Sequence, residues 1–120
     1  MVTILGVDNE PQILQMCKRA RDRMGYEVLL AASGEAALEV LRANPQRVSL
    51  VILDMLMPGM SGRQTFLRLR EIAPSVKVLL SSGYGVEEQA TEILEQGCDG
   101  FLQKPYDLKV LSAKLQELLG

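Results

Sequence analysis

Four short polar segments carry residue types that together suit phosphoryl-group chemistry. They are Asp8-Asn9-Glu10, Asp54, Ser81-Ser82 and Lys104, and each follows a run of mainly apolar residues. A carboxylate can receive a phosphoryl group when the charges on its own oxygens and on the phosphoryl oxygens are neutralised, commonly by a hard cation and a lysine. The residue types therefore favour a site in which one of these carboxylates accepts a phosphoryl group.

The other side chains suit the remaining parts of this chemistry. Carboxylates and a backbone carbonyl are ligands that Mg²⁺ accepts. Lys104 can pair with one phosphoryl oxygen, and Ser82 can donate a hydrogen bond to another, with Ser81 as its rival for that role. Glu10 is better explained as an acidic residue at the start of a helix, where the helix dipole favours negative charge.

These segments can meet only if regular elements bring them to one place. Short apolar runs predict five strands, at 2–7, 27–31, 50–53, 76–81 and 100–103. Between and after them, apolar residues recur at helical spacing. The predicted helices are one ending at Gly25, one over roughly 34–43 after Ser33, one carrying Phe66, a short one near 87–96 and one capped by Asp107.

Alternating strands and helices predict an α/β fold with a doubly wound, five-stranded parallel sheet, because parallel neighbours need a crossover that a helix supplies. The economical strand order is 2-1-3-4-5, with a reversal between strands one and three. Sites in such sheets lie beyond the carboxyl ends of the strands at the reversal. This order brings Asp8 beside Asp54, with Ser82 and Lys104 closing in from the other side.

Composition bounds the remaining possibilities. The 120 residues make room for one domain over 1–120, and 48% hydrophobic residues can build its core. A net charge of −2 argues against direct nucleic-acid binding, and no apolar run approaches the roughly 20 residues of a membrane span. Cys17 and Cys98 lie in apolar surroundings, as expected of reduced thiols in a cytoplasmic protein. Because the chain has no histidine, any phosphohistidine donor must belong to another domain or protein.

The ordered set of motifs resembles the receiver domains of two-component response regulators. The segments that carry the resemblance are Val7-Asp8-Asn9-Glu10-Pro11, Leu53-Asp54-Met55-Leu56-Met57-Pro58-Gly59-Met60-Ser61-Gly62, Ser82-Gly83-Tyr84-Gly85 and Lys104-Pro105. The spacing of 28 residues from Asp54 to Ser82 and 22 more to Lys104 is similar to that of the family. The resemblance covers the whole chain and implies a flavodoxin-like receiver fold.

The resemblance also implies roles for individual residues. Asp54 would be the phosphoacceptor, Lys104 the phosphate partner, and Ser82 and Phe101 the switch residues. The implied Mg²⁺ ligands are Asp8, Asn9, Asp54 and the backbone carbonyl of Leu56. The Lys104–Pro105 peptide would be cis, which is plausible because only a bond to proline tolerates cis at small cost.

Partners follow from the same resemblance. The phosphoryl donor would be a histidine kinase or a histidine phosphotransfer domain. Phosphorylation would change the surface of the fourth helix, fifth strand and fifth helix, which would bind a partner or a second copy. Some segments look similar to receivers of hybrid histidine kinases, so we expect such a parent rather than a stand-alone regulator.

One departure from the family pattern and two other protein classes leave alternatives open. The family usually has aspartate where this chain has Asn9, so metal affinity should fall. A working receiver therefore competes with a degenerate pseudo-receiver that serves only as an interaction module.

An aspartyl-phosphate phosphohydrolase typically has a second acid two residues after its nucleophile, where this chain has Leu56. A flavodoxin-like cofactor protein would need a phosphate-binding loop after the first strand, where this loop is acidic. We expect a non-enzyme that catalyses its own phosphorylation and loses the phosphoryl group slowly, since neither Leu56 nor Tyr84 suits a water-orienting role.

Overall fold

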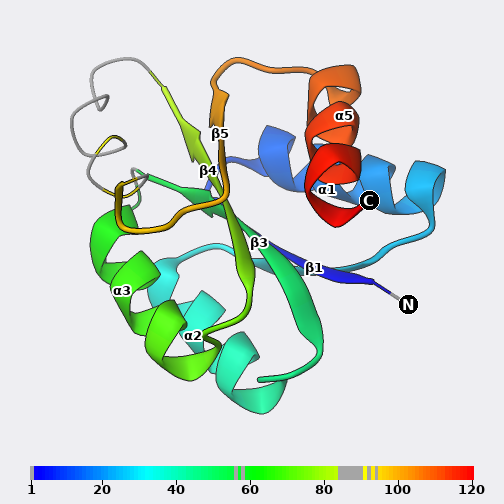
Figure 1. The fold of residues 1–120 in the computed structure, drawn as a ribbon. Helices are drawn as coiled ribbons and strands as arrows, with labels where there is room; N and C mark the ends of the chain where they lie inside the picture. The colour runs from blue at the N-terminus through cyan, green and yellow to red at the C-terminus, as the bar shows by residue number, and fades with distance from the viewer. Residues whose placement is uncertain (1, 56, 58, 84–90, 92, 94) are drawn as a thin grey trace.

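Five parallel strands form one sheet with helices on both of its faces (Figure 1). The computed structural model describes residues 2–55, 57, 59–83, 91, 93 and 95–120. The strands are β1 (Thr3–Val7), β2 (Glu27–Ala31), β3 (Val48–Asp54), β4 (Lys77–Ser82) and β5 (Gly100–Gln103), and the helices are α1 (Pro11–Met24), α2 (Gly34–Ala43), α3 (Gly62–Ile72) and α5 (Leu108–Leu119). The order β2-β1-β3-β4-β5 confirms the predicted doubly wound fold. Most of the helix expected near 87–96 falls outside the described residues.

Local sequence signals account for where the helices begin and end. Ser33 and Asp107 accept hydrogen bonds from the backbone N–H groups of Ala36 and Val110, as predicted for N-cap residues. Gly25 ends α1 with φ of 76°, a left-handed conformation that glycine adopts without steric cost. Ser61 begins α3 with a reciprocal capping box, which also fixes the end of the loop that follows Asp54.

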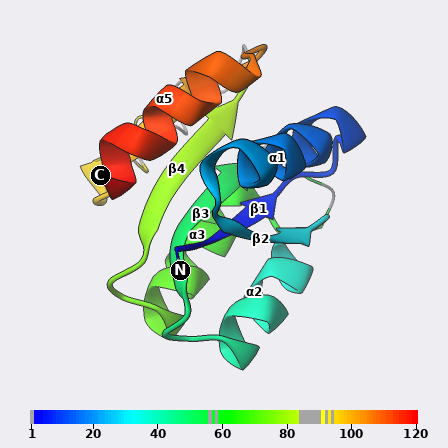
Figure 2. The ribbon, with the colours of Figure 1, turned by 90° about the vertical axis from the view of Figure 1, so that its right-hand side faces the viewer.

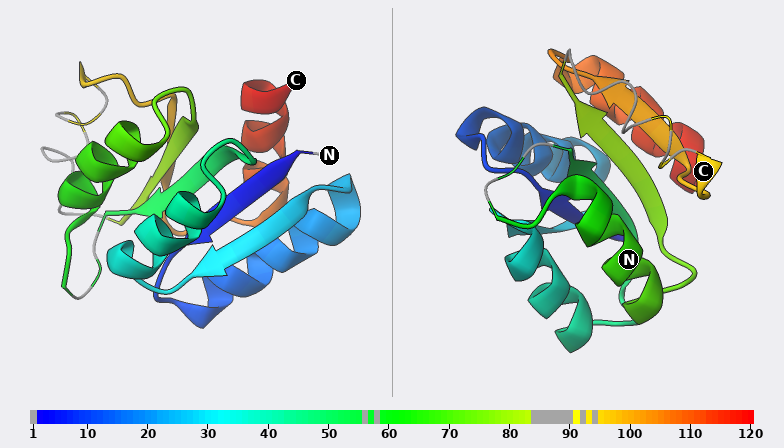
Figure 3. Two further views of the ribbon diagram at one scale, coloured as in Figure 1. Left: turned by 90° about the horizontal axis from the view of Figure 1, so that it is seen from below. Right: turned by 90° about the vertical axis from the view of Figure 1, so that its left-hand side faces the viewer.

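The sheet separates two apolar clusters. One lies against α2 and α3 and includes Leu53 and Leu80, while the other lies against α1 and α5 and includes Ile52 and Leu79. Figures 2 and 3 show these two helix pairs on opposite faces of the sheet. A central strand buried on both faces must be apolar throughout, which explains the unbroken apolar run that precedes Asp54.

The register of the sheet brings the predicted site to one edge. Val7 pairs with Leu53, so the segment that begins at Asp8 follows β1 directly beside the end of β3. Asp54 itself pairs with Ser81 on β4. Within the described part of the chain, no helix is both long and apolar enough to cross a membrane.

Candidate functional site

Lys104 lies among three carboxylates at the carboxyl ends of the strands. Its Nζ is 3.2 Å from Asp54 Oδ1, 3.0 Å from Asp8 Oδ2 and 2.8 Å from Glu10 Oε1. Asp54 and Asp8 are only 3% and 1% exposed. One ammonium group therefore faces three carboxylates, two of them buried, and the site carries an excess of negative charge that favours a further cation.

These contacts keep Lys104 charged. Burial by itself would lower the pKa of Lys104, but its contacts with Glu10 and Asp8 and the charge of Asp54 outweigh burial and raise that pKa above its ordinary value. A lysine whose pKa is raised in the folded state stabilises the fold fully at pH values below the ordinary lysine pKa. This stabilisation is lost only as the pH rises through the raised pKa. The Lys104 side chain is therefore protonated and positively charged at neutral pH.

Asp8 is held so that one of its oxygens faces the site. Its Oδ1 accepts a hydrogen bond of 2.8 Å from the backbone N–H of Glu10. Its Oδ2 is buried and forms an ion pair with the Lys104 ammonium group at 3.0 Å, with no further hydrogen bond from a described residue. A buried carboxylate oxygen with unused acceptor capacity beside a second buried carboxylate fits a hard divalent cation such as Mg²⁺.

The described acidic residues do not complete a metal site alone. Among them and the described cysteines, no group of three or more is arranged to hold a metal ion. Further oxygen ligands would have to come from other groups. Asn9 lies exposed beside Asp8, whereas the backbone carbonyl of Leu56 lies outside the described residues, as does Tyr84.

The two serines at the end of β4 have different surroundings. Ser82 is buried and its hydroxyl donates to the Gly83 carbonyl at 3.1 Å. Ser81 is also buried, and its Oγ lies 3.1 Å from Tyr106 Oη. Phe101 is partly buried against the cluster on the α2 and α3 face. The switch roles of Ser82 and Phe101 stay predictions.

Lys104 begins the segment that connects β5 to α5. The Lys104–Pro105 peptide is cis, as expected. The backbone N–H of Lys104 donates to the Ser82 carbonyl at 2.7 Å, which ties this segment to the end of β4. Burial raises the pKa of Tyr106 to about 12, so its phenol is neutral at physiological pH.

The loop after Asp54 packs tightly on the start of α3. The Gly62 N–H donates to the Met55 carbonyl at 3.2 Å, and a Cβ on Gly62 would lie 2.7 Å from Met55 Cα and 2.9 Å from the Asp54 carbonyl oxygen. Both are backbone atoms, so neither can rotate away. Glycine at this position therefore permits the close approach that sets the backbone at Asp54.

We expect Gly62→Ala to lower the free energy of unfolding by about 2 kcal/mol, as is typical of overpacking. In an ordinary helix the same change would be stabilising, so the sign tests the contact directly. Urea denaturation measures the effect. Gly83→Ala is the matched control, since a Cβ there meets nothing within 4 Å, and it should change stability by less than about 0.5 kcal/mol. Equal stability of the two variants would contradict this account of Gly62.

Two contacts of the site were not foreseen from sequence. Glu10 occupies the predicted start of α1, but its carboxylate reaches Lys104 rather than capping the helix. Tyr106 carried no recognised signal, although it follows Lys104-Pro105 and reaches a strand end beside Asp54. Both contacts join residues far apart in the chain, so no local pattern pointed to them.

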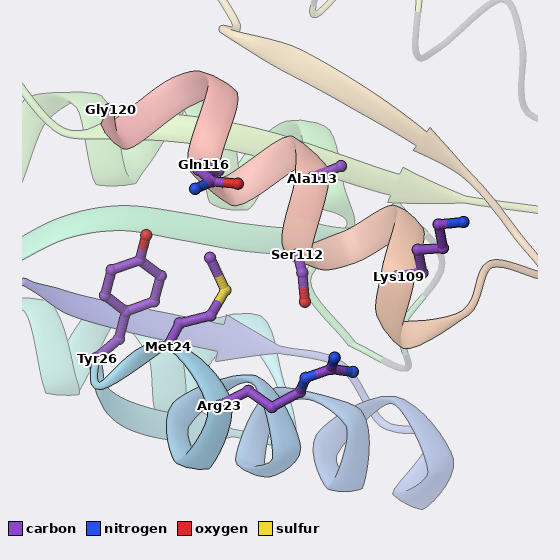
Figure 4. A pocket seen from close by; sticks show the side chains of 8 residues that line it. All are labelled: Arg23, Met24, Tyr26, Lys109, Ser112, Ala113, Gln116 and Gly120. Atoms are coloured by element: carbon purple, nitrogen blue, oxygen red, sulfur yellow. The ribbon is translucent and has the colours of Figure 1, made fainter.

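One cavity of the described structure lies away from this cluster. It has a volume of about 620 Å³ and is lined by α5, the end of α1 and Tyr26 (Figure 4). Met24 ends α1 and Tyr26 directly precedes β2, at the end of the sheet opposite the strand carboxyl ends. The side chains of the four polar segments therefore do not line this cavity.

Comparison with known proteins gives one family. The model of the response regulator receiver domain matches residues 4–116. The chain is 35% identical to the sensor kinase CckA of Brucella abortus over 98% of its own length and 12% of that protein. It is 32% identical to the phosphate regulon transcriptional regulatory protein PhoB of Pseudomonas aeruginosa over 98% of its length and 51% of that protein. The chain thus spans about half or less of these curated relatives.

Solved structures agree with the fold. A response regulator receiver domain protein from Clostridium thermocellum superposes with a TM-score of 0.91 at 30% identity, covering 99% of this chain and 94% of that one. The chemotaxis protein CheY4 of Vibrio cholerae gives a TM-score of 0.86 at 29% identity, covering 98% of both chains.

Proposed function

Because this chain belongs to the response regulator receiver family of two-component signalling, we propose that Asp54 accepts a phosphoryl group from a phosphohistidine on a partner histidine kinase or histidine phosphotransfer domain. One carboxylate oxygen of Asp54 forms a bond to phosphorus, and the bond between phosphorus and the imidazole nitrogen breaks, with the imidazole leaving. The observation that carries the proposal is the buried Asp54 carboxylate, held 3.2 Å from the ammonium group of Lys104.

Each neighbour of Asp54 has a part in this proposal. Lys104 is already charged and close, so it can pair with a phosphoryl oxygen without being reorganised. Ser82, at the buried end of β4, is the hydroxyl that turns toward the phosphoryl group, and Phe101 moves into the space it leaves. Leu56 and Tyr84 make the loss of the phosphoryl group slow.

Members of this family bind Mg²⁺, and the donor set of this chain supports the same ion. Asp8 and Asp54 would hold it, joined by Asn9 and the Leu56 carbonyl. When bound, the ion supplies positive charge that offsets the charge of the phosphoryl oxygens. The buried Oδ2 of Asp8, which keeps acceptor capacity beyond its ion pair with Lys104, is the feature that favours this assignment.

Asn9→Asp should tighten Mg²⁺ binding roughly three- to tenfold, because a further carboxylate raises the negative charge around a divalent cation. Isothermal titration calorimetry measures the affinity. Gln15→Glu, which adds one negative charge on the exposed side of α1, controls for net charge and should leave affinity nearly unchanged. Equal affinity in Asn9→Asp and the parent would exclude Asn9 as a ligand.

The test of the proposed function uses the whole chain with acetyl phosphate as a small phosphodonor. With Mg²⁺ and rapid acid quenching, the intact mass should rise by one phosphoryl group. Chelation with EDTA should remove the rise. A mass that stays unchanged across saturating donor concentrations would overturn the proposal.

The proposed output surface lies on the side of β5 and α5. A groove of about 580 Å³ runs there, with Phe101 and Val110 among its lining residues. Val110 is a large apolar side chain that is 47% exposed. These features support a surface that binds a partner or a second copy after phosphorylation. We also propose a cytoplasmic location, which suits reduced cysteines, and no direct nucleic-acid contact, which suits a net charge of −2.

The parent protein has two candidate forms. The chain matches part of a protein named a sensor kinase and part of one named a transcriptional regulatory protein. A hybrid histidine kinase is the form we propose, and the neighbouring coding sequence distinguishes it from a regulator. A pseudo-receiver that only binds partners is the alternative function. The uncharged Asn9, where the family usually has aspartate, favours it, and the intact Asp54–Lys104 pair opposes it.

A further inference from the structure

A hydrogen bond joins the segment after Lys104 to the strand residue beside Asp54. Ser81 Oγ and Tyr106 Oη lie 3.1 Å apart. Ser81 is fully buried and pairs with Asp54 on one side and Leu102 on the other. Because side chains alternate along a strand, Asp54 and Ser81 point to the face of Ile52 and Leu79, which α1 and α5 cover.

Tyr106 reaches Ser81 from that same face. Its ring packs against the cluster between the sheet, α1 and α5. Two positions earlier, the backbone N–H of Lys104 donates to the Ser82 carbonyl. One position later, Asp107 caps α5. The backbone that carries Lys104 is therefore tied to β4 by its own N–H before the proline and by the phenol of Tyr106 after it.

These two hydrogen bonds, one on each side of the proline, matter because they position the backbone from which the Lys104 side chain extends. Lysine ends in a point charge on a flexible four-carbon stem, so the place of its backbone largely decides which carboxylates its ammonium group can reach. Lys104 Nζ stands 3.2 Å from Asp54 Oδ1 with its side chain only 13% exposed. A small shift of the segment between β5 and α5 would therefore change the distance from Lys104 Nζ to Asp54 Oδ1 before it disturbed the packing of the core.

We propose that Tyr106 is a positioning residue for phosphoryl acceptance, acting through its hydrogen bond to Ser81 to hold Lys104 against Asp54. The inference rests on the proposed function, since it assigns Tyr106 a part in a reaction at Asp54. Tyr106→Phe keeps the ring in the core and removes only the hydroxyl, which leaves the buried Ser81 hydroxyl without this partner.

The test is a double-mutant cycle on the rate of acceptance from acetyl phosphate with Mg²⁺. Tyr106→Phe should slow labelling about fivefold, equivalent to about 1 kcal/mol. In a Lys104→Ala background the same change should slow it less than about twofold, because the effect of Tyr106 passes through Lys104. Ser81→Ala should match Tyr106→Phe, and the two together should cost no more than either alone.

A second measurement keeps the cycle complete if Lys104→Ala reacts too slowly. Beryllofluoride, a phosphoryl mimic, is titrated with Mg²⁺ into the parent, Tyr106→Phe, Lys104→Ala and the variant with both changes. Its affinity should show the same coupling between Tyr106 and Lys104. Tyr26→Phe is the matched control, because it removes the same hydroxyl at the opposite edge of the sheet, in the cavity of Figure 4. It should react at the parent rate.

The outcomes separate this inference from the function on which it rests. If Tyr106→Phe slows labelling by the same factor in the native and the Lys104→Ala backgrounds, Tyr106 has only a structural role and the inference is overturned. An unchanged rate in the otherwise native chain would overturn it as well. Failure of the native chain to be labelled at all would instead overturn the proposed function, and the inference with it.

Discussion

Asp54→Asn should abolish phosphoryl labelling of this chain by acetyl phosphate. An amide nitrogen replaces one carboxylate oxygen, and the neutral amide is far too weak a nucleophile to attack phosphorus at a useful rate. The loss should exceed roughly a thousandfold, or more than about 4 kcal/mol of barrier. Intact mass after acid quenching measures it, and peptide mapping of the native chain should place the phosphoryl group on Asp54.

The matched control is Asp22→Asn, which makes the same chemical change at a carboxylate on the exposed face of α1. Among the residues that the structure describes, Asp22 forms an ion pair with its neighbour Arg21 alone, and its side chain is 71% exposed. This variant should be labelled at the parent rate. Labelling that persists in Asp54→Asn would refute the assignment of the acceptor, whatever the rate in the control.

Lys104→Ala should damage both the reaction and the fold. Removing one preorganised positive group from a site where charge develops typically slows a reaction by 10²–10³-fold, so we expect a loss of at least about a hundredfold. The variant also leaves Asp8 and Asp54 buried without their counter-ion. Because Lys104 also pairs with Glu10, whose side chain is 52% exposed, we expect a loss of about 2 kcal/mol in the free energy of unfolding, below the range for fully buried pairs.

Mg²⁺ provides a second readout of the same change. Added Mg²⁺ should restore part of the stability of Lys104→Ala, since a divalent cation can offset the charges that the ammonium group no longer balances. Urea denaturation with and without Mg²⁺ measures this. Lys114→Ala, which removes an exposed pair with Glu117, should change stability by less than about 0.5 kcal/mol. A Lys104 variant as stable as that control would contradict the charge balance described for the site.

The sequence alone determined the fold and the residues that end its strands. The apolar run before Asp54, the helical spacing through Ile13, Cys17 and Ala20, and the caps at Ser33 and Asp107 are local patterns, and local patterns fix strand and helix types. Once the elements were known, 2-1-3-4-5 was the economical order for a five-stranded parallel sheet. That order placed Asp8, Asp54 and Lys104 at one edge.

Tertiary structure decided the contacts that no local pattern encodes. Lys104 contacts Glu10, which is 94 residues away in the sequence. Tyr106 contacts Ser81 because the segment before α5 lies on the face of the sheet that α1 and α5 cover. Sequence spacing predicted that Ser81 and Ser82 both lie near the site. Only the register, which pairs Asp54 with Ser81, decided which of the two shares the face of Asp54, because a shift of one residue turns every side chain of a strand to the opposite face.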